Sequence, residues 1–238
     1  DFSSLHVSKN LRKASARYTI AVDSAFEEVV AGCIDQHGQG WLYPPVCNLL
    51  RSMTEQQSTQ QPNTKVKVHT FELREKVTGR LVAGELGYTV GSIYTSLTGF
   101  RSPGTHGCGK LQLLATALVL KRQGFAFLDL DQPLPYKDSL GAKSLDRSEF
   151  LERFRSHRND SSVTKPSFWG LDDPGLSKVG CVRDLLRHSD AKQPTTSQER
   201  NCNGPQSKKQ LKRKMKQERK AAVKSLKAHQ PILQAELH

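Results

Sequence analysis

The chain has 238 residues, a formal net charge of +13 and 36% hydrophobic residues. Ten of its cations and one acid lie in Lys208–Lys227, so this segment contributes +9 and the rest of the chain is only mildly basic. No apolar run is long enough to cross a membrane, no CxxC pair occurs and the histidines are scattered, which argues against a membrane protein and a zinc site. We expect no metal, no cofactor and a cytoplasmic location.

The first third of the chain predicts an arm, a strand and two helices. Residues 1–16 are polar and basic, as in a short helix or arm. The β-branched, alternating "RYTIAV" predicts a strand. Ser24 and Glu27 form a capping-box pattern before an amphipathic helix, and a second helix is expected from about Pro45.

A polar, Gln-rich loop is expected at residues 54–64, before three strands. Their predicted bounds are Lys65–Leu73, Leu81–Val90 and Ser92–Phe100. Short turns at Gly79 and Gly91 predict that these strands form an antiparallel meander.

The next segment predicts a helix and a further strand. The Gly-rich "RSPGTHGCGK" opens a helix that ends at Gly124, and the apolar "FAFLDL" follows it. Strand, helix and strand in this order predict a parallel crossover. The whole order of elements predicts a mixed α/β domain of the acetyltransferase-like (GNAT) fold over residues 17–158, with one mixed sheet.

The remainder of the chain predicts less structure. Asp146 and Glu149 are expected to cap one more helix. Residues 159–206 have the composition of a linker with little order, and residues 207–238 that of a basic tail, disordered or helical. Such a tail can bind RNA phosphates without sequence specificity, and it is equally typical of a nuclear-localisation patch.

Two acids follow the strand at "FAFLDL". Because side chains alternate along a strand, Asp129 and Asp131 are expected on one face, with Gln132 next to them. One carboxylate could orient an amine while the other accepts its proton. Acids at strand ends are also common turn formers, so the pattern alone leaves a structural role open.

The loop "GTHGCGK" has the composition of an anion site. Successive backbone N–H groups at a helix start attract phosphate, and glycine lets it approach closely. Gly104, Gly107, Gly109 and Lys110 are therefore the candidate phosphate-binding residues. A mobile surface loop is the alternative.

Several stretches together resemble the leucyl/phenylalanyl-tRNA–protein transferase family. They lie in order between about Leu5 and Phe154, and they are "LHVSKNLRK", "YTIAVDSAFEEVVAGC", "GWL", "LVAGELGY" and the "SLGA" that follows the strand ending in Asp. The resemblance implies transfer of an amino acid from aminoacyl-tRNA to the N-terminus of an acceptor protein, which marks that protein for degradation. It also implies an acetyltransferase-like fold behind a small N-terminal domain, of which residues 1–16 would be a remnant. We expect a monomer.

The resemblance also assigns roles to residues. Asp129 matches the Asp of the family's Asp-x-Gln, ten residues before Ser139 of "SLGA", whereas Asp131 stands at the Gln position and Gln132 is displaced by one. Trp41 aligns with a Trp that packs against the terminal adenosine of the tRNA. Tyr94 and Ser139 join it as expected substrate-binding residues.

Two positions depart from the family pattern. Leu97 stands where the family has a Glu, and Glu85 replaces a Met that lines an apolar side-chain pocket. Either the pocket admits a polar or cationic side chain, or Glu85 turns toward water as a catalytic acid. We favour the second. Two rival functions stay open: an acyl-CoA N-acyltransferase, favoured by the Gly-rich loop, and a non-catalytic RNA-binding protein, favoured by the missing Glu and the basic tail.

Overall fold

A mixed sheet organises the fold. The computed structural model describes residues 2–58, 65–163 and 179–189, which belong to one unit. Its strands lie in the order β5-β4-β3-β2-β1-β6. They are β1 (Tyr18–Val22), β2 (Val66–Glu75), β3 (Leu81–Val90), β4 (Ile93–Arg101), β5 (Phe127–Asp129) and β6 (Val179–Cys181). Neighbouring strands are antiparallel except β4 and β5, which are parallel, so the mixed α/β class is confirmed.

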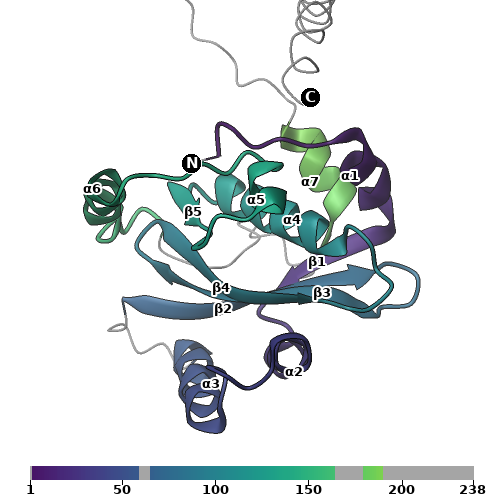
Figure 1. Ribbon diagram of the computed structural model, residues 1–238, viewed down its shortest axis with the longest axis horizontal. Helices are drawn as coiled ribbons and strands as arrows, with labels where there is room; N and C mark the ends of the chain where they lie inside the picture. The colour runs from purple at the N-terminus through teal and green to yellow at the C-terminus, as the bar shows by residue number, and fades with distance from the viewer. Residues whose placement is uncertain (1, 59–64, 164–178, 190–238) are drawn as a thin grey trace, which may run out of the picture. The chain divides into compact units, whose positions relative to one another are not determined.

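Helices cover both faces of this sheet. They are α1 (Lys9–Ala14), the short 3-10 helix η1 (Ser15–Arg17), α2 (Phe26–His37), α3 (Pro44–Ser58), α4 (Cys108–Arg122), α5 (Pro135–Asp138), α6 (Arg147–His157) and α7 (Val182–Ser189). Figure 1 shows α2 and α3 below the sheet and α4, α5 and α7 above it. None of the helices in the described part of the chain is long and apolar enough to pass through a bilayer.

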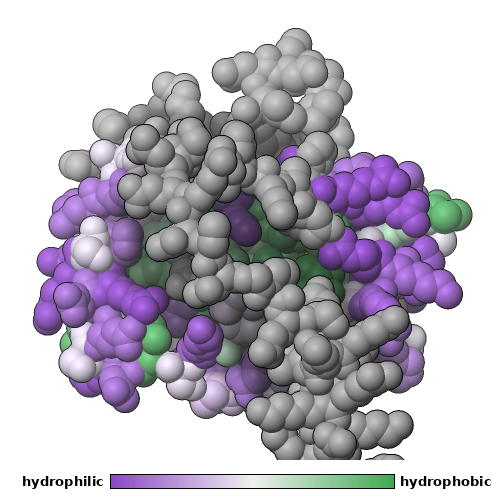
Figure 2. All heavy atoms as spheres, turned by 90° about the horizontal axis from the view of Figure 1, so that it is seen from above, coloured by the Kyte–Doolittle hydropathy of each residue, from purple (hydrophilic) through white to green (hydrophobic). Residues whose placement is uncertain are grey.

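The centre of the sheet is buried on both faces, which explains why its strands are apolar on both faces there. Strand β2 is buried from Val68 to Leu73, so its apolar residues serve two separate cores. Phe71 and Leu73 pack with α4, whereas Val68 packs with α2 and α3. Seen from the α4 side, hydrophobic residues gather in the middle of the face and hydrophilic residues lie toward both sides (Figure 2).

The meander between β2 and β4 is confirmed within two residues at each end. Its turns contain Gly79 and Gly91, whose positive φ angles of 70° and 58° suit glycine. Helix α3 continues to Ser58, so the predicted loop at residues 54–64 begins too early. Residues 59–64 lie outside the described part of the chain.

The predicted capping box at the start of α2 is wrong. Helix α2 has Ala25 as its N-cap residue, without a side-chain capping bond. Glu72 of β2 takes this role instead, because its Oε1 accepts hydrogen bonds from the backbone amides of Ser24 and Ala25, both at 3.3 Å. Glu27 pairs with Arg51. Burial raises the pKa of Glu72.

The predicted cap of α6 is also wrong in its contacts. Asp146 is the N-cap residue, but its side chain makes no capping bond. Glu149 instead forms an i,i+4 ion pair with Arg153 at 2.7 Å. The sequence therefore predicted where the helix begins, but it did not predict which hydrogen bonds the side chains of Asp146 and Glu149 make.

The expected linker at residues 159–206 contains β6 and α7, so this prediction is wrong for residues 179–189. Strand β6 pairs with β1, and α7 packs against α4. Leu185 and Leu186 are buried in the core on the α4 side of the sheet. The rest of the expected linker beyond residue 163, and the basic tail at 207–238, lie outside the described residues.

Truncating Leu186 tests the packing of α7. Leu186 is only 1% exposed, so we expect Leu186→Ala to lower the free energy of unfolding by about 2–4 kcal/mol. Arg183→Ala, on the exposed side of the same helix, should change it by less than about 0.5 kcal/mol. Urea denaturation measures both. Equal, small effects would mean that α7 does not pack on the sheet.

Candidate functional site

Strands β4 and β5 pair over only a short length and then separate. The parallel ladder joins Ile93 to Phe127, Tyr94 to Leu128 and Thr95 to Asp129. Directly after it, β4 has a bulge: Ser96 faces Gly87 and Thr98 faces Leu86, so Leu97 has no partner on β3. Bulges often lie beside active sites, where they re-aim side chains.

A cavity of about 620 Å³ lies along the separated half of β4. We call it the β4 cavity. It is lined by residues 96–101 of β4, the C-terminal end of α2, the first turns of α4 and the segment 130–137. Its lining includes three cations and two histidines, which are Arg101, Lys110, Lys137, His37 and His106. These cations outnumber the two acids of the lining, Glu85 and Asp131, so the cavity as a whole is suited to an anion.

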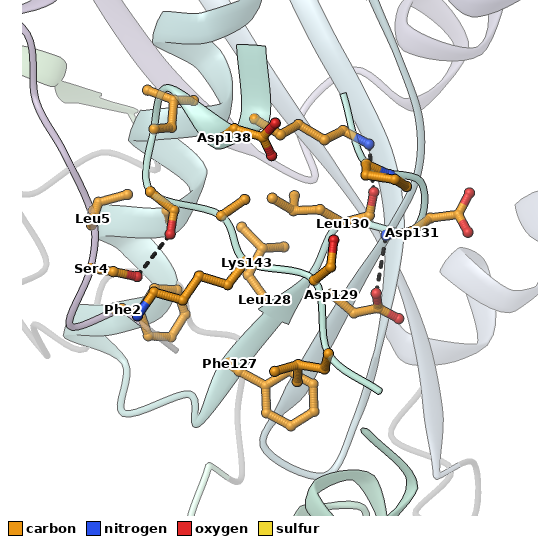
Figure 3. Close-up of a pocket in the computed structure, with 18 of the residues that line it drawn as sticks. Phe2, Ser4, Leu5, Phe127, Leu128, Asp129, Leu130, Asp131, Asp138 and Lys143 are labelled. Carbon is orange, nitrogen blue, oxygen red and sulfur yellow. Dashed lines mark hydrogen bonds between the residues drawn. The ribbon is translucent and has the colours of Figure 1, made fainter. Parts of the chain in front are cut away.

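A second cavity, of about 710 Å³, lies on the other side of the loop that follows β5. We call it the N-terminal cavity because Phe2, Ser4 and Leu5 form one of its walls. Figure 3 shows these residues on one side and Asp129 to Asp131 on the other. Its lining also includes the segment from Lys137 to Leu145 and the first turns of α6.

The two cavities meet at the same small set of residues. These shared residues are Leu113, Leu130, Asp131, Gln132 and Lys137. The Lys137 ammonium donates hydrogen bonds to the backbone carbonyls of Leu130 and Gln132, at 2.5 and 3.0 Å. Lys137 therefore holds the loop that separates the two cavities.

The two acids after β5 do not share a strand face, so that prediction is wrong. Asp129 is the last residue of β5, and Asp131 has a positive φ of 57°, which ends the strand geometry between them. The Asp131 amide donates a hydrogen bond to Asp129 Oδ1 at 3.0 Å. Asp129 thus forms the turn. Asp131 and Gln132 are exposed and line both cavities, whereas Asp129 lines only the N-terminal cavity.

Glu85 does not turn toward water, so the favoured expectation for it is wrong. It lines the β4 cavity and is only 3% exposed, because its place on β3 puts it beneath α4. Its Oε2 accepts a hydrogen bond from Gln112 Nε2 at 3.1 Å. Burial raises the pKa of Glu85. Tyr94 is fully buried and lines neither cavity.

The Gly-rich loop brings three of its four predicted residues to the β4 cavity. Gly107 is the N-cap of α4 with a φ of 79°, and Gly109 and Lys110 lie in the first turn of that helix. Lys110 Nζ also donates a hydrogen bond to Ser139 Oγ at 3.1 Å. Gly104 lies in the preceding turn and lines neither cavity.

The "SLGA" stretch fixes the N-terminal segment in place. The Ser4 hydroxyl donates to the Gly141 carbonyl at 2.8 Å, and the His6 amide donates to the Leu140 carbonyl at 2.8 Å. A Cβ atom on Gly141 would lie 1.9 Å from the Ser4 carbonyl oxygen. Ser139 lies one turn earlier and lines neither cavity. The motif therefore builds a wall of the N-terminal cavity.

Replacing Gly141 with alanine tests this contact. We expect Gly141→Ala to lower the free energy of unfolding by about 2–4 kcal/mol, because it adds a backbone clash to an unfavourable φ of 97°. Gly104→Ala is the matched control: its φ is 75°, but no atom lies within 4 Å of the added Cβ. It should cost about 1 kcal/mol. Urea denaturation compares them, and equal losses would show that the contact with Ser4 contributes nothing.

Trp41 lies between α2 and α3 and is 42% exposed, which excludes a core role. It lines neither cavity. Its indole is free to stack on a base, as an exposed aromatic side chain can.

The structure adds residues that the sequence did not indicate. Lys137 and Gln112 have central contacts in the site, yet neither belongs to a recognisable pattern. Gln36 and His37 reach the site from α2, where they bond to the Arg101 amide and the Gly99 carbonyl. Only the pairing of β4 along the sheet brings these residues together.

Comparison with known proteins agrees with the motifs. The family model for leucyl/phenylalanyl-tRNA protein transferase matches residues 1–155. The leucyl/phenylalanyl-tRNA–protein transferase of Shewanella pealeana is 29% identical over 163 residues, which is 67% of this chain and 62% of that relative. Those of Stutzerimonas stutzeri and Edwardsiella ictaluri are 28% and 29% identical, over 67% and 69% of this chain and 67% and 63% of the relatives.

The chain therefore spans 62% to 67% of the length of these curated relatives. The family match itself covers more than half of the chain, and it includes β1 to β5, both cavities and the "SLGA" stretch. The chain belongs to the leucyl/phenylalanyl-tRNA protein transferase family.

Proposed function

We propose that this protein transfers an amino acid of the leucine/phenylalanine class from aminoacyl-tRNA to the N-terminal amine of an acceptor protein, which marks the acceptor for degradation. The observation that carries the proposal is the pair of cavities that meet at the loop after β5. A reaction between two large substrates needs two entrances and one point where they meet. Asp131, Gln132 and Lys137 line both cavities and so mark that point.

The β4 cavity receives the aminoacyl end of the tRNA. Arg101 and Lys110 lie at this cavity beside the N-terminus of α4, where free backbone amides and the helix dipole favour phosphate. Gly107 and Gly109 leave this end open, since a Cβ at either position would meet no atom closer than 3.9 Å. Trp41 stacks on the terminal adenosine, outside the cavity.

The N-terminal cavity receives the acceptor. Three acids and four cations line this cavity, and the two acids at the loop after β5, Asp129 and Asp131, suit the ammonium that a protein N-terminus carries at neutral pH. Phe2 and Leu5 give this cavity an apolar wall for the side chain beside that amine.

The reaction itself needs little more than positioning and one proton transfer. Asp131 orients the incoming amine and accepts its proton, and Asp129 keeps Asp131 in place through the 3.0 Å hydrogen bond. The ammonium first loses one proton to solvent through Asp131, which frees the nitrogen lone pair. The amine nitrogen then forms a bond to the ester carbonyl carbon, the bond from that carbon to the ribose oxygen breaks, and a second proton passes from the nitrogen through Asp131 to the ribose oxygen. Gln132 lies beside the meeting point, where its amide can donate to the developing oxyanion.

The separation of β4 and β5 after a short parallel ladder supports an acetyltransferase-like (GNAT) fold. We further propose that the protein acts as a monomer in the cytoplasm. Residues 17–158 would carry the catalytic activity, and residues 207–238 would add sequence-independent affinity for RNA.

The test is a transfer assay with labelled amino acids. The protein is incubated with tRNA charged with leucine, phenylalanine or lysine and with a peptide that begins with Arg or Lys. We expect label in the peptide, and none when the tRNA is deacylated and the free amino acid is added. A parallel reaction with labelled acetyl-CoA tests the rival acyltransferase, which the glycines at the start of α4 favour. Label from acetyl-CoA alone would reject the proposal, and binding of tRNA without any transfer would favour the non-catalytic RNA-binding alternative.

A further inference from the structure

The N-terminal cavity carries acids on one side and cations on another. Asp129 and Asp131 belong to the end of β5 and the loop after it, whereas Lys143 and Arg147 lie between the "SLGA" stretch and the first turn of α6. Figure 3 shows the Lys143 side chain extended toward Phe2, away from the two carboxylates. A ligand that fills this cavity therefore meets a negative side and a positive side.

Two of the four cations in the lining already have partners within the protein. The Lys137 ammonium donates to backbone carbonyls of the loop after β5, and Arg153 pairs with Glu149 at 2.7 Å. Among the described residues, no hydrogen bond or ion pair is made by the ammonium of Lys143 or the guanidinium of Arg147. These two side chains can therefore bind an anion that enters the cavity.

The acids nearby do not neutralise this positive side from within the cavity. Asp146, Glu149 and Glu152 belong to the same stretch of chain, but they line neither cavity. Asp138 lines the cavity from the end of α5, and Figure 3 shows its carboxylate apart from the Lys143 ammonium. Cations that line a cleft with apolar walls attract an anion more strongly than the same charges on an open surface.

We propose that Lys143 and Arg147 bind an acidic side chain close to the N-terminus of the acceptor, so that the protein prefers acceptors with Asp or Glu among their first few residues. The inference rests on the proposed function, because it assigns the N-terminal cavity to the acceptor. The acceptor amine lies at Asp131, and its chain crosses the cavity toward α6. An extended chain advances about 3.3 Å per residue, so only residues close to the amine can reach these cations.

A general attraction between opposite charges is the alternative explanation. The protein carries a net charge of +13, so any acidic peptide is drawn to it to some extent. Such an attraction depends on the total charge of the peptide and not on the position of its acid. It also depends equally on every exposed lysine. The position of the acid and the choice of lysine therefore distinguish the two explanations.

The test uses four octapeptides of identical composition. Each begins with Arg and carries one Glu, at position 2, 3, 4 or 8, among Gln and Ala residues. Binding to the full chain is measured by the fluorescence anisotropy of an uncharged dye at the C-terminus, and transfer is measured from leucyl-tRNA. We expect the best of the first three peptides to bind about fivefold more tightly than the fourth, in line with one partly exposed ion pair. The preference should appear in KM and not in kcat, because the contact lies away from the reacting amine.

Three variants assign the preference to one side chain. Lys143→Met keeps a long stem without the charge, and the fivefold ratio should fall below about twofold. Lys143→Arg should preserve the ratio. Lys121→Met is the matched control, because Lys121 is also exposed but lies in the last turn of α4 and lines neither cavity. It should keep the full ratio. Acetylation of the peptide amine should weaken binding of the preferred peptide, since it removes the ammonium that lies at Asp131.

The outcomes separate this inference from the proposed function. Transfer to all four peptides with equal KM and equal affinity would overturn the inference and leave the proposed function standing. Transfer to none of them would overturn the proposed function, whereas a positional preference in anisotropy would still support the acid-binding site. Equal losses in Lys143→Met and Lys121→Met would assign the preference to net charge and overturn the inference. If Lys143→Met does not fold, as judged by its thermal transition, the four peptides on the unaltered protein still decide whether position matters.

Discussion

Asp129→Asn is expected to lower the rate of aminoacyl transfer about a hundredfold while leaving the protein folded. The substitution removes one negative charge from the N-terminal cavity but keeps an oxygen that can accept the hydrogen bond from the Asp131 amide. The turn that holds Asp131 at a φ of 57° is therefore preserved. The loss in rate then reports the negative charge of Asp129 near the ammonium, apart from its hydrogen bond to Asp131, and electrostatic contacts to a reacting group are typically worth about 10²-fold in rate. Initial rates of peptide labelling, with saturating charged tRNA, measure it.

Two further variants make this result interpretable. Asp146→Asn makes the same chemical change at an exposed acid that lines neither cavity, and it should leave the rate within about twofold. Asp129→Ala removes the acceptor as well as the charge, so it should lower the rate further and destabilise the loop. If Asp129→Asn keeps the full rate and only Asp129→Ala is slow, Asp129 acts as a turn former alone.

Glu85→Gln is expected to stabilise the protein at neutral and alkaline pH by about 1–3 kcal/mol. The glutamine oxygen can still accept the bond from Gln112, and its NH₂ group can donate toward the unpaired hydroxyl of Tyr94. The change therefore removes a buried charge without removing its hydrogen bond. Urea denaturation between pH 4 and pH 8.5 measures the difference between the variant and the unaltered protein.

The sign of the pH dependence follows from the direction of the pKa shift. Burial is the main cause that raises the pKa of Glu85 above its ordinary value of 4.5, whereas Gln112, Tyr94, Ser96 and Lys137 lower it. An acid with a raised pKa binds more protons in the folded state, so the unaltered protein loses stability as the pH rises above 4.5 and through the raised value. The advantage of Glu85→Gln should thus be small near pH 4, grow with pH and then become constant.

Glu27→Gln is the control, because its effect on the free energy of unfolding should depend on pH in the opposite direction. The hydrogen bond from Arg51 lowers the pKa of Glu27, so this acid contributes stability above its unfolded pKa, and that stability is lost as the pH falls. Its substitution should cause a small loss at neutral pH that disappears in acid. Glu72 also has a pKa raised by burial, but it is present in every protein compared and therefore cancels. A pH-independent effect of Glu85→Gln would mean that Glu85 is protonated throughout the range.

The sequence determined the elements whose signals are local. Alternation predicted β1, two glycines predicted the turns of the meander, and the helical spacing of leucines after the Gly-rich loop predicted α4. These patterns depend on the geometry of the chain within a few residues, so they can be read directly. The order and spacing of several short stretches, from "LHVSKNLRK" to "SLGA", also sufficed to indicate the family.

The sequence did not determine α7 or the cap of α2. Leu185 and Leu186 form too short an apolar pattern to stand out after residues 159–178, and they are fixed only by contact with the core on α4. Glu72 caps α2 because the pairing of β1 with β2 brings it to the start of that helix. A contact between residues about fifty positions apart produces no periodic pattern in the sequence, so sequence analysis could not predict it.

The site shows the same division most clearly. The sequence placed Asp129 at the end of a strand, but only the tertiary structure decided that the strand stops there, so that Asp131 leaves the predicted face. The sequence also placed Glu85 on a strand, but it did not decide whether that face of the strand is buried or exposed to water. The pairing of β3 between β2 and β4, with α4 packed above, buried that carboxylate in the floor of a cavity. A strand's own sequence fixes which residues share a face, whereas the elements packed on that face decide whether it meets water, a core or a ligand.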